Sequence, residues 1–267
     1  MKKFIFAGVL SLLIFGTNLY GQQFFSYDWK SSEQSKARFA VYPPLNDYDS
    51  RYIVKQLNAK GETGVTGFFE TTVKGDLNTG KLILFSPKGD SLEMINFVEG
   101  KKNGTSLKWR DTGELYGRQN FLNGKEDGIS EWYFKNGKIS ARYVMSQGEK
   151  ISENFWYDDG TIEEDSKEAN KKPQFRGGVE GFLGMISSKL IYPRNCYLNG
   201  TQGRVIVSFL IDTDGIVSDA AIVQSVHPDL DREAIRAVMT SPKWSPGKMH
   251  NQLVNVRNVI PIIFQIR

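Results

Sequence analysis

The sequence predicts two domains of different fold class, an all-β domain of repeated hairpins over residues 61–162 and an α+β domain over residues 173–267. In the first region, glycines and aromatic residues recur every 24 residues. In the second, apolar residues change from helical spacing to strict alternation and back, which marks helix, hairpin, helix and final strand in turn. A chain of 267 residues is long enough for both, since one domain typically holds roughly 100–200 residues.

The first 21 residues have the pattern of a secretory signal peptide. Two lysines precede an apolar stretch from Phe4 to Phe15, and the small residue Gly21 precedes two glutamines. An uncleaved signal anchor is the alternative, but a spanning helix needs roughly 20 apolar residues and this stretch is shorter. We therefore expect export and cleavage after Gly21.

Charge and cysteine content narrow the class of protein further. The formal net charge is +4, and the loss of the two signal lysines leaves +2, too small an excess for a nucleic-acid-binding face. Cys196 is the only cysteine, so no disulfide can form within one chain. Its thiol could be reactive, but a small half-buried residue is the favoured interpretation.

Residues 61–162 repeat with a period of 24, and residues 22–60 contain short apolar segments that we expect to add strands to the same sheet. Glycines, and the Asn-Gly and Asp-Gly pairs among them, supply the positive φ angles of tight hairpin turns. One hairpin cannot bury its apolar face alone, so neighbouring repeats must stack. Three glycine series keep the interval, apart from a last step of 23 in the first: Gly89, Gly113, Gly137 and Gly160; Gly100, Gly124 and Gly148; Gly80, Gly104 and Gly128.

Aromatic residues keep step with these glycines, as Phe85, Trp109, Tyr133 and Tyr157 in one column and Phe97, Phe121 and Met145 in another. We interpret the columns as buried seams of the stack, and a surface that binds sugar or lipid is the alternative. The region resembles the MORN repeats, whose units are β-hairpins with an aromatic residue shortly after a glycine. The 24-residue spacing is that of the bacterial secreted variety of these repeats.

The charged residues 163–172 are predicted to form a solvated linker. Beyond it, apolar residues at helical spacing predict a helix over residues 178–190. Alternation predicts a strand over residues 204–212, and an Asp-Gly turn leads into a second antiparallel strand over residues 216–225. A second helix begins at His227-Pro228-Asp229 and ends before Pro242.

The final strand is expected to run from Leu253 to Ile266, well beyond the usual five or six residues. Pro261 lies inside it and cannot donate to a ladder, which confines the strand to a sheet edge or a bulge. A long open edge exposes unpaired N–H and C=O groups, so it is a candidate docking site for a strand of another chain.

Four motifs follow one another in this region: Pro173-Gln174-Phe175-Arg176-Gly177-Gly178, Tyr192-Pro193, Gly203-Arg204-Val205 and Pro242-Lys243-Trp244-Ser245-Pro246-Gly247. In this order and spacing they resemble the C-terminal domain of TonB, the periplasmic protein that grips outer-membrane transporters in Gram-negative bacteria. The resemblance covers residues 173–267. It implies a three-stranded antiparallel sheet with two helices.

The resemblance also implies a function and the residues that carry it. TonB domains bind the short extended TonB box of a transporter by strand addition at the final strand. The implied partner is an outer-membrane TonB-dependent transporter or another envelope protein, and a second copy of this chain could use the same edge. The implied docking residues are Leu253, Asn255, Arg257 and Val259, with Ile191, Tyr192 and Pro193 nearby to help hold the box.

We predict no enzymatic activity, no cofactor, no metal and no small-molecule substrate. His227 and His250 are the only histidines, and neither has an acid or cysteine partner at a metal-ligand spacing. No nucleophile elbow, phosphate loop or dinucleotide fingerprint occurs.

The leading interpretation is a periplasmic, non-enzymatic adaptor in TonB-dependent transport, and two others stay open. The protein could be an energy transducer anchored in the inner membrane and facing the periplasm, if the first twenty residues remain as a spanning helix. It could also be a structural repeat protein that binds peptidoglycan or lipid through residues 61–162.

Overall fold

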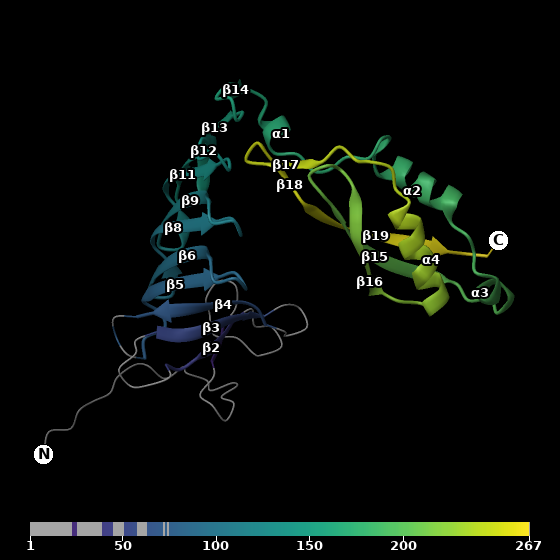
Figure 1. Cartoon of the computed structure of the whole chain (residues 1–267), viewed down its shortest axis with the longest axis horizontal. Helices are drawn as coiled ribbons and strands as arrows, with labels where there is room; N and C mark the ends of the chain where they lie inside the picture. Colours follow the sequence, from purple (N-terminus) through teal and green to yellow (C-terminus); the bar gives the residue numbers. More distant parts are fainter. Residues whose placement is uncertain are drawn as a thin grey trace, which may run out of the picture. The chain divides into compact units, whose positions relative to one another are not determined.

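The computed structural model describes residues 23–25, 39–44, 51–57, 63–71, 73 and 75–266. The chain divides into two compact units, Met1–Glu153 and Asn154–Arg267 (Figure 1). The predicted signal peptide and its cleavage position lie outside the described residues. No helix among the described residues combines the length and the apolar character needed to cross a membrane.

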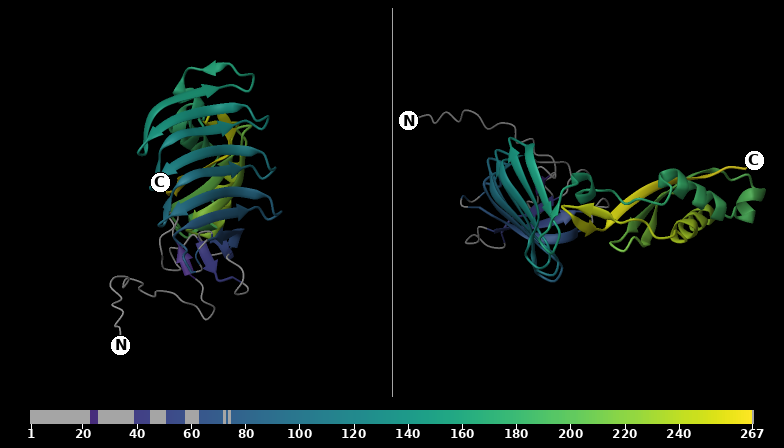
Figure 2. Two further views of the ribbon diagram at one scale, coloured as in Figure 1. Left: turned by 90° about the vertical axis from the view of Figure 1, so that its left-hand side faces the viewer. Right: turned by 90° about the horizontal axis from the view of Figure 1, so that it is seen from above.

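In the described residues, fourteen antiparallel strands form one sheet whose main path follows the order of the chain, so the predicted large β-sheet is confirmed. The strands lie one above another (Figure 1) and bend in the same sense (Figure 2). They are β1 (Gln23–Phe25), β2 (Phe39–Tyr42), β3 (Arg51–Leu57), β4 (Thr63–Glu70), β5 (Gly80–Phe85), β6 (Ser91–Val98), β7 (Lys101–Lys102), β8 (Gly104–Trp109), β9 (Leu115–Leu122), β10 (Lys125–Glu126), β11 (Gly128–Tyr133), β12 (Ile139–Ser146), β13 (Glu149–Trp156) and β14 (Ile162–Glu163).

One hairpin turn recurs along this sheet at the predicted interval. The N–H of the first turn residue donates to the carbonyl of the residue four positions later. The N–H of the glycine, three positions after the first residue, donates to the carbonyl of that first residue. In the second copy these bonds join Arg110 to Glu114 at 2.9 Å and Gly113 to Arg110 at 3.0 Å. The left-handed backbone explains why glycine recurs at this position. The four glycines, Gly89, Gly113, Gly137 and Gly160, have φ angles of 93°, 91°, 79° and 95°.

A second turn, of two residues, ties each repeat to the one before it. Both of its residues have positive φ, as in Asn123 (52°) and Gly124 (88°), which is the geometry of a type I′ turn. The glycine N–H donates to a carbonyl 22 residues earlier, at 2.7 to 2.8 Å: Gly100 to Asn78, Gly124 to Lys102 and Gly148 to Glu126. Main-chain bonds therefore join consecutive repeats, while membership of the MORN family stays a prediction.

The aromatic columns are not the buried seams that we expected. Phe85, Trp109 and Tyr133 are half-buried and Tyr157 is exposed, and in the other column only Phe97 is buried. The deeply buried residue stands one position earlier, as at Leu84 and Trp132. The reason is that adjacent side chains of a strand point to opposite faces of the sheet.

Trp132 packs directly on the backbone of the neighbouring strand. It is 6% exposed and lies opposite Gly117 in the register of β9 and β11. A β-carbon at Gly117 would come within 2.5 Å of the indole ring. Glycine at this position therefore makes room for the large buried side chain of the repeat unit.

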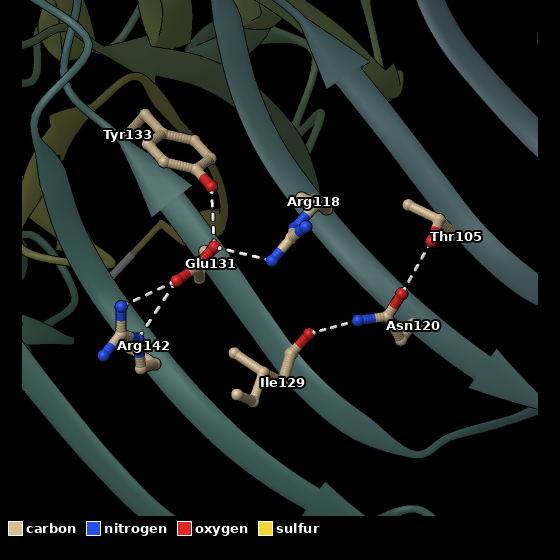
Figure 3. A network of polar contacts seen from close by, with 7 residues as sticks. All are labelled: Thr105, Arg118, Asn120, Ile129, Glu131, Tyr133 and Arg142. Carbon is tan, nitrogen blue, oxygen red and sulfur yellow. Dashed lines mark hydrogen bonds and ion pairs between the residues drawn. The ribbon is translucent and has the colours of Figure 1, made fainter.

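The opposite face of the sheet carries a polar network (Figure 3). Glu131 on β11 is 8% exposed and accepts hydrogen bonds from Arg118 at 3.0 Å, Arg142 at 2.8 Å and Tyr133 at 2.8 Å. Burial disfavours the charged carboxylate, but the hydrogen bonds from Tyr133 and Arg142 and the two positive charges outweigh it. The pKa of Glu131 is therefore lowered from its ordinary value.

The C-terminal unit contains a three-stranded antiparallel sheet in the order β16, β15, β19. Side chains of α2 and α4 share one core with β15 and β19, so both helices cover the same face of the sheet (Figure 1). The predicted helices and hairpin are confirmed, whereas α3 and the β17–β18 hairpin were not predicted. The elements are α1 (Ser166–Ala169), α2 (Gly178–Lys189), α3 (Arg194–Leu198), β15 (Gly203–Ile211), β16 (Val217–Gln224), α4 (Pro228–Met239), β17 (Gly247–Met249), β18 (Gln252–Val254) and β19 (Val256–Phe264).

The predicted final strand over residues 253–266 is shorter in the structure. His250 and Asn251 have positive φ angles of 55° and 57° and turn the chain back on itself. Leu253 therefore pairs with Lys248 in the β17–β18 hairpin, and Asn255 separates that hairpin from β19. The expectation of one fourteen-residue strand was wrong, because a tight turn diverts its first residues to another partner.

Most residues of the predicted solvated linker, 163–172, are exposed, but the segment also has regular structure. They contain α1, whose N-cap Asp165 accepts a hydrogen bond from the N–H of Lys167 at 2.8 Å. Lys171 and Lys248 exchange two main-chain hydrogen bonds, at 3.0 and 2.8 Å. The charged side chains gave no sign of this pairing, because the backbone of the segment makes it.

Candidate functional site

Strand β19 forms one edge of the C-terminal sheet, and among the described residues it pairs only with β15. Pro261, opposite Ile206, has no N–H to give to β15. Residues of an antiparallel ladder direct their N–H and C=O groups alternately toward and away from the partner strand. Because Pro261 has no N–H, it suits a position whose main-chain groups face away from β15. Arg257 and Val259 lie four and two positions before Pro261, so their N–H and C=O groups also point to the open side of the strand.

The same strand has one buried and one exposed face. Ile262 and Phe264 point into the core and are 3% and 1% exposed. Val259 and Ile263 point away from the helices and are 56% and 62% exposed. An extended partner at this edge would therefore meet free main-chain groups beside apolar side chains.

The side chain of Arg257 is held on the exposed face. Its guanidinium donates to the carbonyl oxygen of Asp219 at 3.2 Å and to the Asp219 carboxylate. Asp219 lies on β16, so the arginine side chain reaches across β15 while its main chain stays at the edge. Of the four predicted docking residues, Arg257 and Val259 lie on β19, whereas Leu253 lies in the β17–β18 hairpin and Asn255 lies between the two.

The other predicted contact segment lies at the opposite end of β19. The ring of Tyr192 stands perpendicular to that of Phe264, with centroids 5.6 Å apart. The Tyr192 hydroxyl donates to the carbonyl of Thr201 at 2.6 Å, and the N–H of Ile191 donates to Glu233 at 2.6 Å. Pro193 is the N-cap residue of α3. These polar groups are thus already engaged, and the structure does not bring this segment together with Leu253 and Asn255.

One contact in this unit escaped the sequence analysis. The sulfur of Cys196 lies 3.3 Å from Nδ1 of His227, although 31 positions separate the two residues. With Asp229 they form a group of three potential metal ligands. The sequence shows no metal-ligand spacing around His227, and only the fold brings Cys196 on α3 to the start of α4.

The chemistry of this group is that of a helix cap. His227 is the N-cap of α4, and its Nδ1 accepts the N–H of Asp229 at 3.1 Å, as the predicted helix start requires. The same nitrogen lies 3.3 Å from the sulfur of Cys196. Burial and the nearby charge of Asp229 raise the pKa of the Cys196 thiol, whereas reactive cysteines have a lowered pKa.

The C-terminal unit is a small domain of the α+β class, with both helices on one face of a three-stranded antiparallel sheet and β19 at one edge of that sheet. Residues 188–266 match the family of the Gram-negative bacterial TonB protein C-terminal. Two curated relatives, each named Protein TonB, from Helicobacter pylori strains J99 and 26695, are 34% identical over 83 residues. That region is 31% of this chain and 28% of each relative, so the chain spans about a quarter of their length.

Two solved structures are similar to part of this chain. The NMR solution structure of the Helicobacter pylori TonB C-terminal domain, residues 194–285, is 30% identical, with 33% of this chain and 91% of that chain covered and a TM-score of 0.27. A longer form, residues 179–285, is 29% identical, with 33% and 80% covered and a TM-score of 0.28. Over residues 188–266, this chain is therefore similar to the TonB C-terminal domain.

Proposed function

We propose that the C-terminal domain binds an extended segment of an outer-membrane TonB-dependent transporter, or of another envelope protein, as an added strand on β19. TonB proteins act with outer-membrane transporters and are not enzymes. The observation that carries the proposal is the unpaired edge of β19 at Arg257 and Val259. Main-chain hydrogen bonds would supply affinity, and the exposed side chains of the strand would supply selectivity.

A proline at Val259 tests this proposal. It removes one outward N–H, and the existing Pro261 lies at the same alternation, so the sheet tolerates proline there. Val259→Ala is the matched control, because it shortens the side chain and keeps the N–H. We expect Val259→Pro to weaken binding of a TonB-box peptide about tenfold, since about 1.4 kcal/mol suffices for that change, and Val259→Ala to stay within about threefold of the parent.

Fluorescence anisotropy measures the binding, and circular dichroism checks the fold of each variant. Arg257→Pro provides a second backbone block at the same alternation. If both proline variants fold and bind as the parent does, strand addition at this edge is wrong and the contact lies around Tyr192 or on the repeats. Analytical sedimentation measures whether the parent forms dimers. If it does and the same proline variants are monomeric, the edge binds a second copy of this chain.

The proposed location is the periplasm, after removal of residues 1–21. We expect the mature protein to begin at Gln22 and to leave the membrane fraction on washing with alkaline carbonate. Intact Met1 in carbonate-resistant membranes would favour the anchored energy transducer. N-terminal sequencing of the mature protein separates these two forms.

A further inference from the structure

The repeat sheet contains an open hollow of about 210 Å³. Residues of β3, β5, β6, β8 and β9 line it: Gln56, Leu84, Leu92, Glu93, Lys108, Trp109 and Tyr116. Its volume lies below the roughly 300–1,000 Å³ of sites for drug-sized ligands. It therefore has room for one small ring and not for a long chain.

Two of the lining residues stand at irregularities of the sheet. The register of β5 and β6 passes from Leu84 opposite Glu93 to Phe85 opposite Ser91, which leaves Leu92 as the extra residue. The register of β8 and β9 makes the same step 24 residues later and leaves Tyr116 unpaired. Because a bulge re-aims a side chain, the repeat turns two side chains into this hollow.

The aromatic wall is held in place from behind. The ring of Tyr116 meets that of Trp132 edge to face, with centroids 5.0 Å apart. The guanidinium of Arg110 lies over the Tyr116 ring, 4.6 Å from its centroid. Arg110 is itself fixed by donating to the carbonyl of Tyr133 at 2.9 Å. Trp109 is half-buried and belongs to the aromatic column whose side chains stay outside the buried core. Two aromatic residues therefore line the hollow, and the contacts with Trp132 and Arg110 fix the ring of Tyr116.

The polar side of the hollow holds one charge of each sign. Nζ of Lys108 lies 3.6 Å from Oε1 of Glu93, and the two side chains are 37% and 27% exposed. Because the two charges offset each other, this side of the hollow does not attract an ion of either sign. With the amide of Gln56, the lining offers both hydrogen-bond donors and acceptors without a net charge.

We propose that this hollow binds a neutral pyranose ring, either a free hexose or the terminal residue of a glycan. A pyranose has an apolar face of C–H groups, which would pack on Trp109 and Tyr116. Its hydroxyls both donate and accept, which fits the Glu93, Lys108 and Gln56 side chains. This site is separate from the proposed peptide-binding edge, and neither proposal depends on the other.

Calorimetric titration of the full mature chain tests the site. The probes are glucose, galactose, mannose and N-acetylglucosamine, their short oligomers, and glucuronate as an anionic comparison. We expect at least one neutral sugar to bind with Kd of about 1 mM or tighter, and glucuronate to bind at least tenfold more weakly. Equal affinity for monomer and oligomer indicates a free sugar, and affinity for the oligomer alone indicates a glycan end.

Trp109→Ala should weaken the affinity for the sugar at least tenfold, and Trp109→Phe should retain part of that affinity. Tyr157→Ala is the matched control, because Tyr157 is the residue of the same aromatic column 48 positions later and is exposed. It should leave binding unchanged. Absence of heat with every sugar at 10 mM, or sugar binding that survives Trp109→Ala in a folded variant, overturns the proposal. Cosedimentation with phospholipid vesicles that depends on Trp109 overturns it in favour of lipid.

Discussion

The carbonyl oxygen of Gly215 accepts the N–H of Trp244 at 2.9 Å, so the β15–β16 turn and the segment after α4 meet backbone to backbone. A β-carbon at Gly215 would lie 2.0 Å from the Trp244 carbonyl oxygen, and the φ of Gly215 is 79°. Only glycine satisfies both conditions. The indole of Trp244 packs against the rings of Phe182 and Phe209, with centroid distances of 4.8 and 6.1 Å.

Gly215→Ala should therefore destabilise the C-terminal unit. The left-handed φ costs about 1–2 kcal/mol for a residue with a side chain, and overpacking against a backbone carbonyl adds about 1–3 kcal/mol. Chemical denaturation of the full chain measures the loss.

The matched control for Gly215→Ala is Gly184→Ala. Gly184 lies in α2, where a β-carbon would meet nothing within 4 Å. Alanine should stabilise the unit there by roughly 0.5–1 kcal/mol, because glycine is a poor helix former. A Gly215→Ala variant as stable as Gly184→Ala would show that the turn can move away from Trp244.

Trp132→Ala should cost about 3–5 kcal/mol, as truncation of large buried aromatics does. Trp109→Ala should cost clearly less, because Trp109 is half-buried and Trp132 is 6% exposed. Thermal melting of the two variants compares them directly. A larger loss of stability for Trp109→Ala than for Trp132→Ala would show that Trp109 is a buried core residue of the repeats.

Acid should weaken the repeat unit through Glu131. Its folded-state pKa is lowered from the ordinary value of 4.5, so its contribution is complete above that value and is lost as pH falls through the folded pKa. The difference in melting temperature between the parent and Glu131→Gln should be largest at pH 7 and should narrow toward pH 3. Glu149→Gln, at an exposed residue of β13, is the control. A gap that stays constant from pH 7 to pH 3 would contradict the role of the ionised carboxylate.

Cys196 should react slowly in the folded protein. Burial raises the pKa of its thiol from the ordinary value of 9.0, and the residue is 1% exposed. The stability gained by keeping the thiol protonated is complete below the unfolded pKa and is lost as pH rises through the folded pKa. At pH 8 we expect alkylation at least tenfold slower than in guanidinium chloride, measured by mass spectrometry. Equal rates would mean that α3 opens readily.

The regular elements of the C-terminal domain were predictable from local pattern. Apolar residues at helical spacing mark α2, and alternation marks β15 and β16, because these periods record which side of an element is buried. The periodic glycines of the repeat region likewise predicted hairpin turns, since a positive φ is a property of the residue itself. The resemblance carried by the Pro173–Gly178 and Trp244 motifs supplied the family.

What the sequence determined by itself is this order of elements, their turns and the edge position implied by Pro261. The tertiary structure alone decided which face of each repeat strand is buried, so Trp132 and not Trp109 enters the core. It also decided that the chain turns back at His250 and Asn251, and that Cys196 meets His227. These features depend on contacts between residues far apart in the chain, and local periodicity records burial without identifying the partner that causes it.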